Sequence, residues 1–512
     1  MAKERKTYPV IDLFAGPGGL GEGFAALKNR NGEAVFKSVA SIEMDRTAHN
    51  TLTLRHFFRR FRENQVPDAY YRYVSGEISK SDLTKLYPKQ WESACESSLR
   101  VTLGSEDHEV VKKAVEKRLA KSRNWILVGG PPCQAYSLVG RSRMMGMDGF
   151  EEDKRHLLYR EYLKIIVDHR PPVFVMENVK GLLSSKINGE FVVQKIVNDL
   201  SSPVRAVTSK QNGLRYNLHP LSSARLSKHE VHPSEFVVKA EDFGVPQARH
   251  RMFIVGIRED IDISPSSLSP SDPPNVKEVI GSLPRIRSGV SKGGDSPERW
   301  RSLLLLANES TWLEQLRYSD SELLVSKLQN VISKIPEAPK RKSAKTYKST
   351  SVLNGWFYDE RLKSLLSHEA RSHMPSDLHR YLFVSAYAAV FEHSPKLTDF
   401  PVDLLPKHRS ASLEKIPVAF PDRFRVQLHG RVATTITSHI SKDGHYFIHY
   451  DPVQCRSLTV REAARLQTFP DNYHFEGPRT SQYHQIGNAV PPYLARQIAE
   501  IVKEVMDALP DD

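Results

Sequence analysis

The chain has 512 residues, of which 39% are hydrophobic, and it carries a formal net charge of +13 at pH 7. This length predicts two domains rather than one small core, and the absence of any run of about 18 apolar residues excludes a membrane-spanning helix. Residues 1–6 are polar and lack the apolar core of a signal peptide, so we expect a cytoplasmic protein. The basic charge favours a polyanionic partner.

The three cysteines are Cys95, Cys133 and Cys455. They form no CxxC pair and have no metal-ligand spacing, so we expect neither a disulfide framework nor a bound metal. A reducing cytoplasm would keep a thiol free.

The first residues predict a strand, a glycine-rich turn and a helix. Residues 8–14 read as a buried strand that runs into AGPGGLGEGF at 15–24. This layout cradles a nucleotide-like cofactor in many α/β proteins. The spacing is not GxGxxG and no P-loop lysine follows, so a simple tight turn is the alternative.

Acidic residues follow the next predicted strands. A second strand is predicted over 36–42, and Glu43 after it can accept both hydroxyls of a ribose. We expect a third strand to end at 76–78. There Glu77 either accepts a hydrogen bond from an adenine amino group or is a solvated surface glutamate.

A strand predicted over 126–128 leads into the loop GGPPCQAYS. Pro131 and Pro132 make this loop rigid, and Cys133 on it lies where open α/β sheets place their ligands. A lone cysteine is most often a small buried apolar residue. A core residue needs no rigid loop, whereas a nucleophile must be held at one position and angle, so we interpret Cys133 as a nucleophile.

Charged residues near two later strands are further candidates. Residues 141–152 predict a mobile loop able to close over a ligand. A strand over 173–176 ends in Glu177, whose pKa would rise in a partly dry site and suit proton donation. Arg249 and Arg251 alternate along an extended segment and point to one side of it. Together they suit an anion or a carbonyl oxygen, although plain surface charge is the alternative.

Amphipathic periodicity predicts helices over 109–121, 460–467 and 493–509. The first of them lies within 79–124, which reads as an insertion without evident chemistry. Residues 485–492 read as a turn before the closing helix.

The middle of the chain differs in character from both ends. Residues 285–455 have few clear strand–helix alternations and read as a second, smaller domain. Residues 337–350 form a basic run that is either a phosphate-contacting arm or a solvated linker. Residues 424–438 alternate as strands do.

Six blocks of this sequence resemble the DNA (cytosine-5) methyltransferase family: DLFAGPGG, GGPPCQAYS, ENVKG, QARHR, REAARLQTFPD and GNAVPP, in the family's order. The resemblance covers 8–284 and 430–505. It implies an α/β fold, with a Rossmann-like S-adenosylmethionine-dependent methyltransferase sheet and a second, smaller target-recognition domain. The catalytic and cofactor-binding domain would be 1–284, completed by 456–512, and the target-recognition domain 285–455.

The resemblance also implies roles for single residues. Cys133 would add to C6 of cytosine, Glu177 would contact N3 and the exocyclic amine, and Arg251 would contact O2. Arg249 would support Arg251. The family usually has Asp where this chain has Glu77. The S-adenosyl-L-methionine pocket would be formed by Phe14, Ala15, Gly16, Gly18, Gly19, Glu43, Met44, Glu77, Ile78, Pro131, Leu158, Asn488 and Ala489.

The implied function is methylation of carbon 5 of a flipped-out cytosine in a specific double-stranded DNA sequence. This would protect DNA from a cognate restriction endonuclease. Two alternatives remain: a cytosine-5 methyltransferase of transfer RNA, and a catalytically inactive DNA-binding relative. The long variable region favours duplex DNA, and the joint presence of Cys133, Glu177 and Arg251 favours activity.

Overall fold

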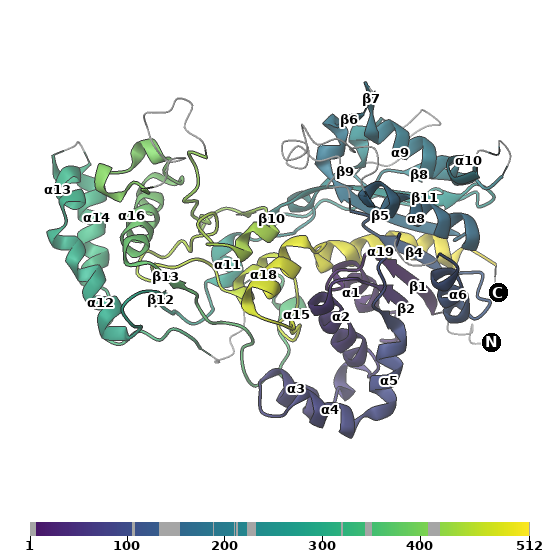
Figure 1. Cartoon of the computed structure of the whole chain (residues 1–512), viewed down its shortest axis with the longest axis horizontal. Coiled ribbons are helices and arrows are strands. Elements are labelled where there is room, and N and C mark those ends of the chain that lie inside the picture. The colour runs from purple at the N-terminus through teal and green to yellow at the C-terminus, as the bar shows by residue number, and fades with distance from the viewer. Residues whose placement is uncertain are drawn as a thin grey trace.

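The computed structural model describes residues 7–104, 108–132, 154–187, 189–208, 210, 213–222, 232–318, 321–343, 351–407 and 420–510. Cys133, the predicted loop at 141–152 and residues 344–350 of the basic run therefore lie outside the described residues. Figure 1 shows a larger part built on a sheet and a smaller helical part beside it.

One eight-stranded sheet organises the larger part, in the order β3-β2-β1-β4-β5-β11-β8, with β9 also paired to β11. The strands are β1 (Tyr8–Leu13), β2 (Phe36–Ile42), β3 (Ser98–Leu99), β4 (Ile126–Gly129), β5 (Val173–Val179), β8 (Tyr216–His219), β9 (Val237–Lys239) and β11 (His250–Arg258). The strands β1 to β5 pair in parallel, whereas β11 is antiparallel to its neighbours. The strand order reverses at β1, which lies between β2 and β4, so a ligand crevice is expected at its carboxyl end.

Helices cover both faces of this sheet. On one face, Val10 of β1 packs in a core with α1 (Gly19–Ala26) and α19 (Pro492–Asp507). On the other face, Ile11 and Leu13 pack in a second core that includes residues of α6 (His108–Leu119), α8 (Lys154–His169) and α9 (Val192–Ser201). Alternate residues of one strand thus face two helix layers. The predicted α/β Rossmann-like fold is confirmed.

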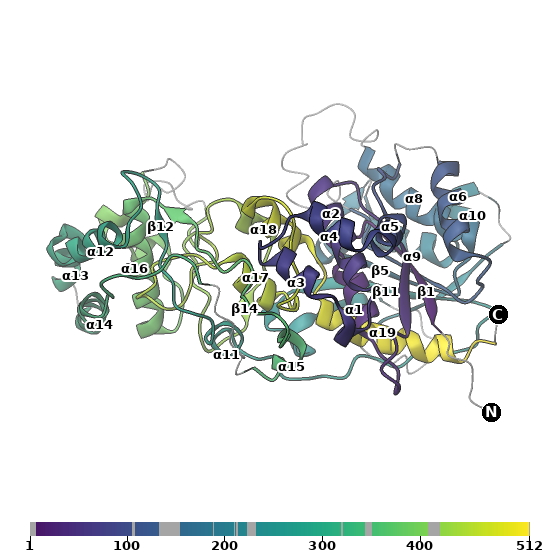
Figure 2. The same ribbon diagram turned by 90° about the horizontal axis from the view of Figure 1, so that it is seen from below.

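Both ends of the described chain meet on this part. The hydroxyl of Tyr8 donates to the backbone oxygen of Met506 at 3.0 Å. The strand β1 and the helix α19 lie next to each other in both views (Figures 1 and 2).

The third strand differs from the prediction. Residues 76–78 form a turn between α3 (Asp68–Val74) and α4 (Lys80–Leu86), and the strand next to β2 is β3. The expected strand end was wrong because Gly76, at φ 82°, ends a short helix instead. The expected insertion at 79–124 consequently contains a strand of the main sheet.

The smaller part is helical. Its helices are α12 (Pro297–Leu305), α13 (Thr311–Arg317), α14 (Glu322–Ser333) and α16 (Pro375–Phe391). They share a separate core with Phe424 and Ile448. The strands expected over 424–438 were largely wrong, because only β14 (Ala433–Thr434) forms there and it pairs with β10 (Gln247–Ala248) of the larger part.

Helices also join the two parts. The elements α11 (Val276–Ile280), α15 (Asn354–Phe357) and α18 (Arg479–Asn488) lie between the parts in both views (Figures 1 and 2). Their buried residues share one core, to which α17 (Val460–Leu466) also contributes. The expected turn at 485–492 was wrong in its first half, because Gln485 to Asn488 form the last turn of α18.

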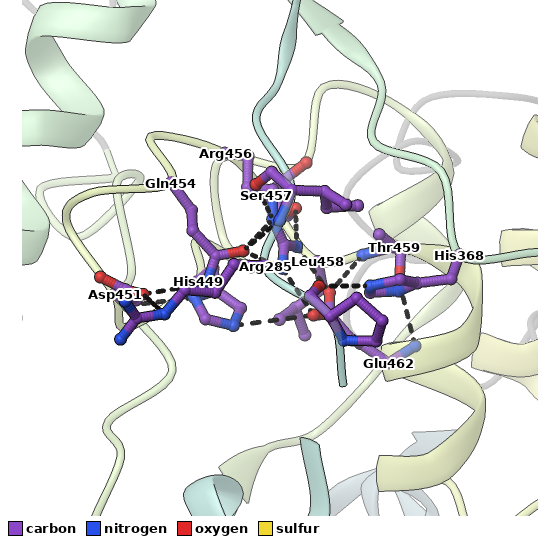
Figure 3. A network of polar contacts seen from close by, with 12 residues as sticks. Arg285, His368, His449, Asp451, Gln454, Arg456, Ser457, Leu458, Thr459 and Glu462 are labelled. Carbon is purple, nitrogen blue, oxygen red and sulfur yellow. Dashed lines mark hydrogen bonds and ion pairs between the residues drawn. The ribbon is translucent and has the colours of Figure 1, made fainter. Parts of the chain in front are cut away.

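A buried ion pair lies where the chain passes between the two parts. Arg456 donates from Nη1 and Nη2 to the two carboxylate oxygens of Glu462, each at 2.7 Å, and both side chains are 1% exposed (Figure 3). Glu462 also accepts the N–H of Thr459 at 2.7 Å, which caps α17. Arg456 Nε donates to the backbone oxygen of Ile286 at 3.1 Å. The pair thereby holds the first and last segments of the smaller part on α17.

Two histidines extend this network. His449 Nε2 lies 3.6 Å from the carboxylate of Glu462. His368 contacts the backbone oxygen of Pro284 at 2.9 Å and the hydroxyl of Thr459 at 3.1 Å (Figure 3). Burial lowers the pKa of His368 to about 4 and that of His449 to about 3. Both rings are therefore neutral at pH 7, and the opposite charges of Arg456 and Glu462 balance.

No helix within the described ranges is long and apolar enough to cross a bilayer.

Candidate active site

A cavity of about 440 Å³ opens at the carboxyl ends of β1, β2, β4 and β5. It lies at the strand-order reversal, where α/β sheets bind ligands. Most of the predicted site residues line it: Phe14, Ala15, Gly16, Gly19, Glu43, Met44, Pro131, Leu158, Glu177, Arg249, Arg251, Asn488 and Ala489. Segments that are far apart in the sequence therefore meet at one site.

The glycine-rich turn has a backbone that most residues cannot adopt. Phe14 has φ 57°, which is rare for a bulky residue and typical of functional sites. Gly16 and Gly18 also have positive φ, at 57° and 97°. A Cβ on Gly19 would lie 2.3 Å from the backbone oxygen of Val490, so only glycine lets α1 begin against the GNAVPP segment. Gly18 is the N-cap residue of α1 and lines a neighbouring cavity rather than this one.

The carboxylate of Glu43 braces the same turn. Its Oε2 accepts the N–H of Gly16 at 2.8 Å, and its Oε1 accepts the N–H of Asp45 at 2.7 Å. Burial raises the pKa of Glu43, and these backbone N–H groups oppose the rise. Each carboxylate oxygen can accept a further hydrogen bond, so Glu43 keeps acceptors for a ligand in the cavity.

Glu177 and Arg251 form the charged wall of the cavity. They lie on the antiparallel strands β5 and β11, where Glu177 pairs with Phe253 and Arg251 with Val179. This diagonal placement brings Arg251 Nε to 3.2 Å from Glu177 Oε1. A Cβ on Gly130 would lie 2.9 Å from Glu177 Oε2, so the glycine leaves room for the carboxylate. Burial raises the pKa of Glu177, although Arg251 and Arg249 oppose it.

Arg249 supports the cavity from behind. Its side chain is buried, and its guanidinium donates to the backbone oxygen of Ile436 at 3.0 Å and to that of Gly487 at 3.3 Å. Burial lowers the pKa of Arg249 well below its usual range, and Arg251 adds to this effect. Arg249 therefore joins β11 to the α18 segment and adds positive charge behind Glu177.

The loop after β4 approaches the same cavity. Gly130, Pro131 and Pro132 line it, and the side-chain amide of Asn178 donates to the backbone oxygen of Pro131 at 3.2 Å. The next residue, Cys133, is outside the described residues. Pro132, the residue directly before the predicted nucleophile in the sequence, thus lines the cavity.

Two predicted cofactor residues lie elsewhere. Glu77 is exposed in the turn after α3, where it lies 3.7 Å from Arg72, and Ile78 packs against the aromatic core of α2 to α5. Neither lines the cavity. The resemblance assigned them by their place in a motif, but the sheet places Val101 and Leu103, after β3, at this wall.

His484 and Asp12 also line the cavity and were not predicted from the sequence. His484 lines the cavity mouth one helical turn before Asn488, and its ring lies 3.3 Å from that amide. Asp12 is a buried acid within the apolar strand β1. A charged residue inside a run such as YPVIDLF is a signal that could have been noticed.

Comparisons with known proteins agree with this geometry. The family described as C-5 cytosine-specific DNA methylase matches residues 84–504. Type II methyltransferase M.Bpa9945I of Bacillus paralicheniformis is 31% identical over 97% of this chain and 99% of its own length. Type II methyltransferase M.DdeI of Desulfomicrobium norvegicum is 26% identical over 96% of this chain and 87% of its own length.

A solved structure supports the fold. An E. coli prophage protein, provisionally named a DNA modification methyltransferase, is 19% identical, has a TM-score of 0.50 and covers 98% of this chain and 100% of its own. The family match spans most of the chain, and the relative from B. paralicheniformis spans nearly all of it. The chain therefore belongs to the C-5 cytosine-specific DNA methylase family and is a DNA (cytosine-5-)-methyltransferase.

Proposed function

We propose that this enzyme methylates carbon 5 of a flipped-out cytosine in a specific duplex sequence, with S-adenosyl-L-methionine as the methyl donor. The observation that carries the proposal is the shared cavity. The braced glycine turn and Glu43 lie on one side of it, and the Glu177–Arg251 pair lies on the other. A cofactor and a base could therefore meet in one enclosed space.

The described residues fit this cofactor. The space over Gly16 is open, because a Cβ added there would meet nothing within 4 Å. Glu43 keeps acceptors for the ribose hydroxyls, and Met44 and Leu158 offer apolar surface for the adenine. The cofactor supplies an electrophilic methyl group when bound. Asn488 and Ala489 would close the pocket from the α18 side.

The base-binding wall fits a cytosine. A protonated Glu177 would donate to N3, and Arg251 would donate to O2, so negative charge that develops on the ring would be neutralised. The raised pKa of Glu177 favours that proton. The thiolate of Cys133 would add to C6 and make C5 nucleophilic. After methylation, loss of the C5 proton would expel the sulfur and restore the ring. The positive charge of Arg251 at the cavity would favour the thiolate form.

The smaller part would read the DNA. We assign residues 285–455 to target recognition and 1–284 with 456–512 to catalysis and cofactor binding. A base within a duplex cannot reach an enclosed cavity, so it must rotate out of the stack. The separate helical core of the smaller part and the net charge of +13 suit a partner with a phosphate backbone.

The setting is proposed from the relatives. Several similar proteins are named type II methyltransferases, so we propose that this enzyme protects DNA from a restriction endonuclease that cuts the same site. The companion endonuclease would be absent from cells that merely express this chain. Methylation alone can therefore be tested first.

Bisulfite sequencing of DNA from expressing cells tests the proposal. We expect protected cytosines at one short recognition sequence with the wild-type enzyme and none with Cys133→Ala. Labelled methyl transfer to duplex DNA, but not to transfer RNA, would separate the two nucleic-acid substrates. Tight DNA binding without a covalent adduct on 5-fluorocytosine DNA would instead favour the inactive relative.

A further inference from the structure

A second cavity of about 500 Å³ lies between helix α1, strand β2 and helix α2 (Arg46–Phe58). Small-molecule sites commonly have volumes of about 300–1,000 Å³. The cavity reaches Thr7, directly before β1, and Phe36, the first residue of β2. The cofactor cavity lies at the carboxyl ends of the same strands, and no described residue lines both cavities. The second cavity is therefore a separate space.

The lining of the second cavity is in part apolar and aromatic. Phe36, Leu52, Phe58 and Tyr473 line it, and each of them is buried. The glycine-rich turn adds Gly18, which has no side chain. Flat aromatic groups pack well against aromatic rings, so this part of the lining suits the ring of an organic ligand.

The charged part of the lining is mainly basic. Six basic residues among the described ones line the cavity: Lys28, Lys37, Arg55, Arg59, Arg60 and Arg62. The acidic residues of the described lining are Glu22 and Glu33. Positive charge is therefore in excess, and the cavity attracts anions.

Two of the arginines share one carboxylate. Arg55 donates to Glu22 from Nε at 2.8 Å and from Nη2 at 2.6 Å, and Arg59 donates to it from Nε at 3.3 Å. The side chains of Glu22 and Arg55 are 1% and 7% exposed. One carboxylate can balance only one of these two guanidinium charges. The shared pair thus leaves positive charge beside the cavity.

Three further basic residues of the lining have no carboxylate partner. No described carboxylate lies within 4.0 Å of Lys37, Arg60 or Arg62. Arg60 donates from Nη2 to the backbone oxygen of Ser93 at 2.7 Å, which orients its guanidinium but leaves the charge unbalanced. Lys37 and Arg62 are exposed as well as lining the cavity, so they lie at its mouth. Their charges are available to an anionic ligand.

Tyr473 connects this lining to the cofactor cavity. It lines the second cavity, and its hydroxyl donates to the backbone oxygen of Pro17, which lines the cofactor cavity. The two cavities are thus adjacent across the glycine-rich turn. A ligand in the second cavity would contact residues that hold this turn, although it would occupy neither the cofactor site nor the base site.

We propose that the second cavity binds a small aromatic phosphate ester, with its ring against the aromatic lining and its phosphate at Lys37, Arg60 and Arg62. The volume suits a compound about as large as a mononucleotide. Phosphate oxygens can accept from several guanidinium and ammonium donors at once, which a single neutral acceptor cannot do. Neither the methyl donor nor DNA is needed for this binding.

Isothermal titration calorimetry of the whole chain with 1-naphthyl phosphate, in a phosphate-free buffer, tests the site. We expect one bound molecule per chain. Its Kd should be at least about tenfold lower than the Kd of 1-naphthol, which lacks the anion, or of inorganic phosphate, which lacks the ring. Absence of binding would overturn the proposal. Equal affinity for 1-naphthol or for inorganic phosphate would overturn the assigned ligand class.

Variants locate the probe on the protein. Lys37→Gln combined with Arg62→Gln removes two exposed charges from the mouth and should raise the Kd of 1-naphthyl phosphate at least about tenfold. The matched control is Lys113→Gln combined with Lys117→Gln, which removes two exposed charges of α6 outside the cavity. It should leave the Kd unchanged. An unchanged Kd in the first pair, or an equal rise in both pairs, would overturn the site.

A change inside the cavity gives an independent check. Ala25 lies on α1 and lines the cavity, so Ala25→Phe should fill part of it and abolish binding of 1-naphthyl phosphate. Circular dichroism and retained binding of S-adenosylhomocysteine would show that this variant is folded. A folded Ala25→Phe protein that bound the probe as tightly as wild type would contradict the proposal.

Competition separates this site from the proposed catalytic one. The Kd of 1-naphthyl phosphate should change by less than about tenfold when S-adenosylhomocysteine or duplex DNA is present at saturation, because the lining residues of the two cavities differ. Displacement by either would place the probe in the cofactor cavity or on the DNA-binding surface, and would overturn the second site. Failure of methyl transfer would overturn the proposed function and leave this binding intact.

Discussion

Glu177 and Arg251 show how single side chains set the chemistry of the cavity. Each lies on a strand of the main sheet, and the antiparallel pairing of β5 with β11 fixes their separation at 3.2 Å. Arg251 alone would keep Glu177 ionised, but burial of the carboxyl has the larger effect and raises its pKa. Glu177 is thus placed to donate a proton, and Arg251 is placed beside it to keep a positive charge.

Glu177→Gln should lower the rate of methyl transfer by about 10²–10⁴-fold, because the amide has no acidic proton to give. In the wild type, the protonated carboxyl is lost as pH rises through its raised pKa, so the single-turnover rate should fall at higher pH. The variant's rate should not follow this fall. Calorimetry with S-adenosyl-L-methionine provides the control and should give near wild-type affinity. A variant that kept the wild-type rate would remove Glu177 from the mechanism.

At the scale of elements, close packing of two helices shapes the cavity. Helix α1 near the beginning of the chain packs on α19 near its end, and glycines permit the approach. A Cβ on Gly23 would lie 2.4 Å from the Cβ of Ala495, and one on Gly19 would meet a backbone oxygen at 2.3 Å. Backbone cannot move aside as a flexible side chain can, so the glycine spacing of AGPGGLGEGF serves packing as well as ligand approach.

Gly19→Ala should lower the free energy of unfolding by about 1–3 kcal/mol through overpacking and should weaken cofactor binding. Urea denaturation and calorimetry would measure the two effects. The matched control is Gly355→Ala in the short helix α15, where an added Cβ meets nothing within 4 Å. That change should be neutral or stabilise slightly. Equal stability of both variants would contradict this account of the turn.

The strands of the sheet could be predicted because short apolar runs between chain breakers are a local signal. Residues 36–42 and 126–128 were located correctly for this reason. The strand β3 has only two residues and carries no such signal. The helices of the smaller part were missed, although Leu324, Leu328, Val331 and Ile332 give α14 a regular helical spacing that was a usable signal. In the site, most of the described motif residues line one cavity, whereas Val101 and Leu103 reach it only through the pairing of β3 with β2.

At the scale of the whole molecule, buried charge holds the two parts together. The Arg456–Glu462 pair joins the segments at Ile286 and Thr459 to α17. A buried pair is expensive to form, yet its loss leaves an uncompensated charge inside the protein. The orientation of the smaller part therefore depends on a contact between residues that do not line the cavity.

Glu462→Gln should lower the free energy of unfolding by about 3–5 kcal/mol, since Arg456 then stays buried without its counter-charge. Chemical denaturation would measure the loss. The comparison variant is Asp260→Asn, which breaks the more exposed pair with Arg258 and should cost less than about 1 kcal/mol. Similar losses for both variants would argue against a special role of the buried pair.

Stability should also fall on mild acidification. Burial lowers the pKa of His56 to about 3, of His368 to about 4 and of His449 to about 3. Below about pH 6.5 these histidines are protonated in the unfolded chain but stay neutral in the folded chain. Each ring therefore lowers the free energy of unfolding by up to about 1.4 kcal/mol for each unit by which the pH falls. These three rings should therefore make stability drop between pH 6.5 and 4. Urea titrations across this range, with His449→Gln as the variant of reduced slope, would check it.

The contact between Tyr8 and Met506 has a consequence for biosynthesis. Because α1 packs on α19, the glycine turn at the start of α1 cannot be packed as in the folded enzyme until α19 has left the ribosome. A nascent chain thus carries an unfinished cofactor crevice through nearly all of its translation. The same proximity means that the two ends could be joined by a short linker and the gene reopened elsewhere, which would yield a circularly permuted enzyme.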